Sequence, residues 1–101
     1  MSQVAMIAKI PAAPGKRAEL AAVFQAMLEH VETEPGTLRY VLHEDAKDDN
    51  VLWFYELYTD QAALDAHAGS SAMKAIGPKL GGLLGGAPEL IALRPLGGKG
   101  A

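Results

Sequence analysis

The sequence contains no cysteine, which excludes disulfide bonds, thiol catalysis and zinc sites built on cysteine. Basic residues are also few: nine lysines and arginines stand against twelve acidic residues, for a net charge of −3. Because no basic stripe is present to neutralise phosphates, we expect no binding to nucleic acid. No apolar run is long enough to cross a membrane, and the N-terminal segment lacks the pattern of a secretion signal. We therefore expect a cytoplasmic protein with no membrane span.

Histidine is scarce as well, and its three occurrences lie far apart without a spacing typical of metal ligands. The glycine-rich segment 80–86 lacks the Lys-Ser/Thr ending of a phosphate-binding loop and the preceding strand of a dinucleotide fingerprint. The sequence therefore predicts neither a metal site nor a bound cofactor.

The chain of 101 residues, half of them hydrophobic, is long enough for one domain, which we place at residues 1–96, followed by a flexible tail at 97–101. Hydrophobic periodicity predicts four strands and two helical regions. The strands are Val4–Ile10, Thr37–Asp45, Val51–Tyr58 and Glu89–Pro95; the helices are Lys16–Thr33, a segment from Thr59 or Asp60 through His67, and a continuation carrying Met73, Ile76, Leu80 and Leu83. The order strand, helix, strand, strand, helix, strand is typical of a ferredoxin-like α+β fold, an antiparallel sheet with both helices on one face.

The strand Val51–Tyr58 carries large apolar side chains on both of its faces. One set of strand residues is expected to face the helices: Leu38, Tyr40, Leu42, Phe54 and Tyr58. The alternate set is expected to face away: Val41, Trp53, Tyr55 and Leu57. Because the second set is too apolar to leave in water, we expect a homodimer that packs sheet against sheet. The alternative cover, the C-terminal tail, is short and rich in glycine.

Glu56 interrupts this apolar strand, and His67 follows eleven residues later on the predicted helix. Burying a carboxylate is costly without a partner, so Glu56 is either paired with Arg39, Lys9 or Arg94, or placed in a pocket where its pKa is raised or where it orients a histidine. His67 shares a helix face with Leu64 and is directed at the sheet. It is either a core residue or, held by Glu56, a general base.

Three aromatic residues are expected to line the same pocket. A hairpin turn near 47–50 places Tyr40 opposite Glu56, while Phe54 and Tyr58 lie on the same strand face as that acid. The alternative for all three is simple aromatic packing. Leu64 is expected to complete the pocket wall from the helix.

Several short motifs in order resemble the antibiotic biosynthesis monooxygenase family, which includes bacterial quinol monooxygenases. They are Pro14-Gly15-Lys16, Glu34-Pro35-Gly36 followed by Tyr40, Glu56 with Tyr58, Ala63-Leu64, His67, and Ser70 or Ser71. The resemblance covers nearly the whole chain. It implies a ferredoxin-like fold, a homodimer whose sheets form a shared α/β barrel, and a pocket between helices and sheet in each subunit.

The resemblance also implies oxidation of a small quinol or phenol by molecular oxygen without flavin, haem or metal. Glu56 and His67 match the recurrent acid and histidine of the family. Haem breakdown is not expected, because the first strand has no asparagine. Two alternatives stay open: an isomerase acting on a small phosphorylated sugar, with Lys9, Arg39 or Arg94 as phosphate ligands, and a non-catalytic binding or stress-related dimer.

Overall fold

The computed structural model describes residues 2–100. Its strands are β1 (Val4–Pro11), β2 (Thr37–Glu44), β3 (Val51–Tyr58) and β4 (Glu89–Leu93), and its helices are α1 (Arg17–Val23), α2 (Gln25–His30), α3 (Gln61–Ala68) and α4 (Ser71–Ile76). Short 3-10 turns, η1 (Val31–Thr33) and η2 (Gly77–Lys79), extend α2 and α4. All four predicted strands are confirmed, with ends that shift by one or two residues.

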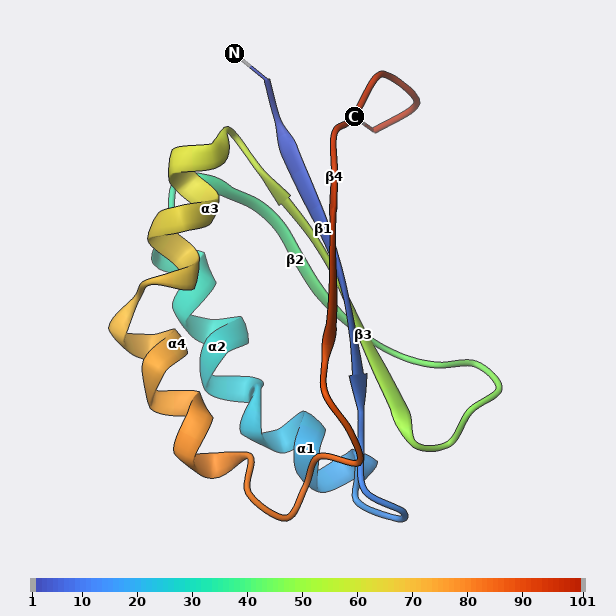
Figure 1. Cartoon of the computed structure of the whole chain (residues 1–101). Coiled ribbons are helices and arrows are strands. Elements are labelled where there is room, and N and C mark those ends of the chain that lie inside the picture. Colours follow the sequence, from blue (N-terminus) through green and yellow to red (C-terminus); the bar gives the residue numbers. More distant parts are fainter. Residues whose placement is uncertain (1, 101) are drawn as a thin grey trace.

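The four strands form one antiparallel sheet in the order β2-β3-β1-β4, and the helices all lie on one face of it (Figure 1). This arrangement is the ferredoxin-like fold that the element order predicts. Tyr40 pairs directly with Glu56 across β2 and β3, as expected from the hairpin. Among the described residues, no helix is long and apolar enough to cross a membrane.

The core lies between the helices and the inner face of the sheet, the face that carries Phe54. Phe54 is 2% exposed, and Phe24 meets it edge-on with ring centroids 5.1 Å apart. Leu20 and Met27, one on each side of Phe24 along the chain, are fully buried. Burial of these side chains is the main stabilising contribution of the first helical region.

The first helical region is not the single helix Lys16–Thr33 that periodicity predicts. At Phe24 the backbone N–H bonds to Ala21 O, three residues back, and the regular four-residue pattern is interrupted between α1 and α2. The tighter turn brings the Phe24 ring onto Phe54, so tertiary packing overrides the regular helix here.

The expectation that Leu38 faces the helices is wrong, because β2 has a bulge at this residue. The register shifts between Thr37, which pairs with Tyr58, and Arg39, which pairs with Leu57. Leu38 is the extra residue, and 43% of its surface is exposed rather than packed against the helices. From Tyr40 onward, β2 follows the predicted alternation.

The outer face of the sheet, opposite the helices, is apolar along a continuous row. Val41 pairs with Tyr55, Tyr55 with Ile7, and Ile7 with Ile91, so one side chain from each strand joins the row. Val41, Tyr55 and Ile91 are each at least 36% exposed. Leu57 belongs to the set expected to face away from the helices, and it is only 3% exposed within the single chain.

Candidate functional site

A cavity of about 420 Å³ lies between α3, α4 and the inner face of the sheet. Apolar side chains make most of its wall: Met6, Ala8, Ile10, Phe24, Phe54, Leu64, Met73, Ile76, Leu80, Leu84 and Leu90. The titratable side chains that line it are those of Tyr40, Glu56 and His67. A largely apolar hollow with a few convergent polar groups is typical of a small-molecule site.

Five of the six residues predicted for the pocket line this cavity: Tyr40, Phe54, Glu56, Leu64 and His67. Tyr58 does not. It is completely buried behind the wall, where it contacts Glu56 and His67. The expectation that Tyr58 forms part of the pocket surface is therefore wrong. Tyr58 instead packs behind Glu56 and His67, which do line the cavity.

Glu56 is 7% exposed, and its partner is a tyrosine rather than a basic residue. The Tyr58 hydroxyl donates a hydrogen bond of 2.5 Å to Glu56 Oε1. Burial raises the pKa of Glu56 above its ordinary value of 4.5, and the Tyr58 hydrogen bond and the His67 charge only partly oppose that rise. Of the two alternatives for Glu56, the ion pair with Arg39, Lys9 or Arg94 is not formed. Among the described residues, no salt bridge joins Glu56 to any of these three cations.

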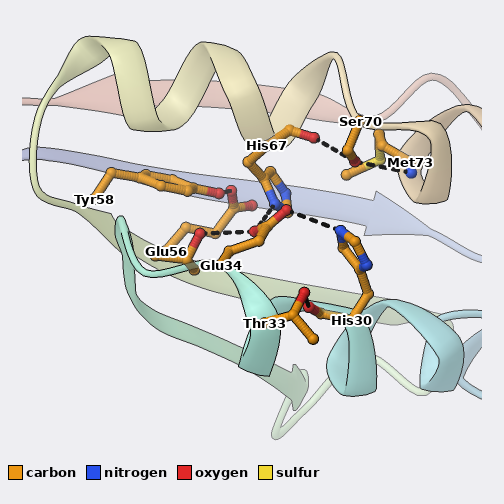
Figure 2. Close-up of polar contacts among 9 residues, drawn as sticks. His30, Thr33, Glu34, Glu56, Tyr58, His67, Ser70 and Met73 are labelled. Carbon is orange, nitrogen blue, oxygen red and sulfur yellow. Dashed lines mark hydrogen bonds and ion pairs between the residues drawn. The ribbon is translucent and has the colours of Figure 1, made fainter.

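His67 is 3% exposed, and the acid that holds it is Glu34 rather than Glu56 (Figure 2). The ring atom Nδ1 lies 2.9 Å from Glu34 Oε1. Glu56 is the acid expected to orient this histidine, but its Oε1 accepts a hydrogen bond from the Tyr58 hydroxyl instead. Glu56 lines the cavity together with His67, whereas Glu34, which contacts the imidazole, is not among the residues that line it.

The carboxylate of Glu34 is fixed by three neighbours from three elements. Besides His67 of α3, it accepts a hydrogen bond of 2.8 Å from the Thr37 hydroxyl at the start of β2, and its Oε2 lies 3.2 Å from His30 Nε2 of α2. Burial by itself would raise the pKa of Glu34, but the hydrogen bonds from His67 and Thr37 and the charges of the two histidines outweigh it, so the pKa is lowered. The two carboxyl groups are therefore shifted in opposite directions, and Glu34 has the lower pKa of the two.

Helix caps define where α3 and α4 begin, and a close contact at Gly36 packs α3 against the segment that carries Glu34. Asp60 caps α3 by accepting from Ala63 N at 2.8 Å, and Ser70 caps α4 by accepting from Met73 N. Gly36 faces α3 so closely that a Cβ at this position would lie 2.5 Å from the Cβ of Ala63. Glycine is required for this approach, and the approach sets the distance between Glu34 and His67.

The second ring nitrogen of His67, Nε2, is buried and has no hydrogen-bond partner among the described residues. The imidazole is packed by Tyr40, with ring centroids 4.9 Å apart, and by Tyr58, at 5.4 Å. Tyr40 in turn stacks on Phe54 at 4.5 Å. One imidazole nitrogen is therefore unpaired among aromatic rings in a residue of the cavity wall, and a neutral imidazole nitrogen can act as a proton acceptor.

The basic residues considered for phosphate binding all lie elsewhere. Lys9 stands over the Trp53 ring at 5.8 Å, Arg39 donates to Gly100 O, and Arg94 lines a separate hollow with Ser2 and Gln3. Within the part of the chain that the structure describes, no lysine or arginine lines the cavity. Within residues 2–100, no group of three histidine, aspartate or glutamate side chains is placed to hold a metal ion.

Sequence reasoning missed Glu34 and His30 as members of the site. Glu34 belongs to the Glu-Pro-Gly segment that ends the first helical region, and its importance depends on a contact 33 residues away in the chain. The spacing of His30 and Glu34, four residues apart at a helix end, is a signal of their mutual contact. No local pattern indicates that His67 would join them.

Comparison with known proteins places this geometry in context. Residues 3–79 match the model of the antibiotic biosynthesis monooxygenase family. Rv0793 of Mycobacterium tuberculosis, named as a candidate monooxygenase, is 35% identical over 95 residues, which cover 94% of this chain and 93% of that protein. An uncharacterised Synechocystis protein, sll1783, is 34% identical over 64 residues, which span 63% of this chain and 44% of that protein.

Solved structures give the same result. A candidate antibiotic biosynthesis monooxygenase from Caulobacter crescentus superposes with a TM-score of 0.89 at 31% identity, covering 95% of this chain and 92% of the other. The structure of Rv0793 superposes with a TM-score of 0.87 at 34% identity, covering 97% and 99% of the two chains.

Proposed function

Because the chain belongs to the antibiotic biosynthesis monooxygenase family, we propose that it oxidises a small quinol or phenol with molecular oxygen and without a cofactor. The observation that carries the proposal is the unpaired Nε2 of His67 at the wall of an apolar cavity. Apolar walls remove water from an electron-rich ring, and the imidazole accepts the hydroxyl proton. The resulting phenolate is the species able to give electrons to oxygen.

For a dihydroxy ring the reaction balances without an external reductant. One oxygen atom replaces a ring C–H hydrogen, the second leaves as water, and the two electrons come from conversion of the quinol to the hydroxyquinone. His67 takes the first hydroxyl proton and returns it to the departing water. Tyr40 and Phe54 hold the ring, and Leu64 closes the wall from α3.

Oxygen uptake with dihydroxynaphthalene tests this function. His67→Ala should lower the rate by roughly 100-fold or more, the usual contribution of a positioned general base. His43→Ala is the matched control, because His43 is exposed on β2 and bonds to Val41 O, and its rate should equal that of the wild type. Equal rates in all three proteins would remove His67 from the reaction.

Two further measurements separate the parts of the proposal. Isotopically labelled O₂ should appear in the quinone product, and extensive dialysis against chelator should leave the rate unchanged. Loss of activity on dialysis, restored by one metal, would contradict a cofactor-free reaction.

The phosphosugar isomerase alternative is the weaker one, because none of its three candidate cations lines the cavity. Turnover of such a sugar in the absence of oxygen would support it instead. A purely binding role requires that the cavity take up a ring without oxidising it, and the labelled-oxygen experiment distinguishes the two.

A homodimer and a cytoplasmic location are also part of the proposal. The exposed row of Val41, Tyr55 and Ile91 on the outer sheet face supports pairing with a second copy of the chain, since a row this apolar gains from burial. Sedimentation measures whether the chain forms a dimer, and cell fractionation measures whether it is found in the cytoplasm.

A further inference from the structure

The two ring nitrogens of His67 have different surroundings (Figure 2). Nδ1 lies 2.9 Å from Glu34 Oε1, whereas Nε2 is buried without a partner in the described part of the chain. The side chain is 97% buried and forms part of the cavity wall. Since buried polar atoms are nearly always paired, an unpaired nitrogen in a residue of the cavity wall is a candidate partner for a ligand atom.

The contacts of Glu34 decide which nitrogen of His67 carries the proton. Its lowered pKa keeps the carboxylate ionised, and a carboxylate can only accept hydrogen bonds. Thr37 donates to Oε1, and His30 approaches Oε2, so the carboxylate cannot rotate away. Nδ1 must therefore donate, and in a neutral imidazole this leaves Nε2 as a bare acceptor.

From this geometry we propose that Glu34 is a positioning residue that fixes the tautomer of His67, and that the cavity thereby selects the hydroxyl-bearing, reduced form of an aromatic ligand. A quinone has only acceptor oxygens, so it cannot bond to a bare Nε2. A ring hydroxyl can donate to it. The ligand class rests on the proposed function, whereas the tautomer and the selection of donors do not.

The selection has a consequence for turnover. The reduced ligand gains a hydrogen bond on entering, and oxidation removes the donor that made it. The quinone oxygen formed there can only accept hydrogen bonds, so the product loses this bond to His67 and leaves a site that still favours the reduced form. The tyrosines around the imidazole do not replace this contact, because Tyr58 already donates to Glu56 and Tyr40 packs against His67 with its ring tilted, without a hydrogen bond to Nε2.

The first test reads the tautomer directly. NMR of isotope-labelled imidazole nitrogens at neutral pH should show a proton on Nδ1 of His67 and none on Nε2 in the wild type. In Glu34→Gln, whose amide can either donate or accept, the opposite tautomer should become populated. A wild-type ring protonated on Nε2, alone or together with Nδ1, would overturn the proposal without need of a variant.

The second test reads ligand selection with two molecules of nearly equal shape, α-naphthol and α-fluoronaphthalene. Binding is measured with no reductant present and under conditions in which neither molecule is turned over. The wild type should bind α-naphthol roughly tenfold more tightly than α-fluoronaphthalene, because one good hydrogen bond in a buried site contributes about that much. Glu34→Gln should lose most of this ratio. The matched control is Glu32→Gln, an exposed acid of the adjoining turn, which should keep it.

The results separate this inference from the proposed oxidation. A protein that discriminates the two naphthalenes but consumes no oxygen would retain the inference and lose the monooxygenase reaction. Equal affinity for the two molecules in the wild type, no binding of either, or full discrimination in Glu34→Gln would each overturn the inference even if oxygen is consumed.

Discussion

The two faces of the sheet reverse the usual distribution of polar and apolar groups. The inner face, covered by helices, buries Glu56 and Tyr58 and contacts a buried histidine. The outer face, open in the single chain, exposes Val41, Tyr55 and Ile91. Each departure costs free energy in an isolated chain, through desolvation of a carboxyl group inside and hydration of apolar surface outside. The comparison supports the two proposals made above, a ligand on the inner face and a second copy of the chain on the outer face.

The largest effect should come from the packed part of the inner face. Phe54→Ala removes a ring that contacts both Phe24 and Tyr40, and it should lower the free energy of unfolding by about 3–5 kcal/mol. Val41→Ala on the outer face should cost about 1 kcal/mol or less, because its side chain is already 44% exposed. Urea denaturation measures both values at dilute protein. Equal losses would show that the two faces are equally packed in one chain.

A charge on the outer face should produce the next largest effect. Tyr55→Lys places a cation in the middle of the exposed row, and in the proposed sheet-to-sheet dimer each subunit would bury one such charge, so the dimer dissociation constant should rise by roughly 100-fold or more. Sedimentation velocity across a concentration series measures the constant, with circular dichroism as the check on folding.

Gln25→Lys provides the matched control for that experiment. This residue is exposed on α2, on the helical side of the molecule, and the change in charge is the same. Its assembly should be that of the wild type. If Gln25→Lys dissociates the protein and Tyr55→Lys does not, the helices rather than the sheet form the interface.

The smallest effects should appear in the pH dependence of stability, where the two acids of the site behave oppositely. The folded pKa of Glu56 is raised above 4.5, so its contribution is fully present below pH 4.5 and is lost as the pH rises through the folded pKa. The folded pKa of Glu34 is lowered, so its contribution is present above pH 4.5 and is lost as the pH falls through the folded pKa.

Urea denaturation of the wild type, Glu56→Gln and Glu34→Gln from about pH 3 to about pH 7 tests these signs. The wild type should lose stability relative to Glu56→Gln on the alkaline side of pH 4.5, and relative to Glu34→Gln on the acid side. Parallel curves for all three proteins would show that neither acid has a shifted pKa.

The fold could be predicted from the sequence because each element carries its own local signal. Alternation in β2 and β3 fixed the faces of the hairpin, and the polar turn between them fixed the pairing of Tyr40 with Glu56. The bulge at Leu38 and the tight turn at Phe24 escaped prediction, since both depend on tertiary packing that no local pattern records.

The candidate site could be predicted only in part for a related reason. His67 and Glu56 lie in one stretch of chain, and their helix and strand positions point both at the same space. The partner of each was not predictable: Tyr58 reaches Glu56 along its own strand, two residues on, and Glu34 reaches His67 from a distant segment. Periodicity assigns side chains to faces, but hydrogen bonds depend on distances that only the folded chain sets.

Gly36 shows how close packing contributes to such a distance, alongside the hydrogen bond of 2.9 Å that its carbonyl accepts from Thr59 N. The interval between its backbone and α3 has room for one methyl group, and Ala63 supplies it. Between them, positions 36 and 63 can therefore hold one methyl group in this space, on either residue, but not two. Sequence change at either position is tied to the other, and the geometry of an imidazole several residues away depends on both.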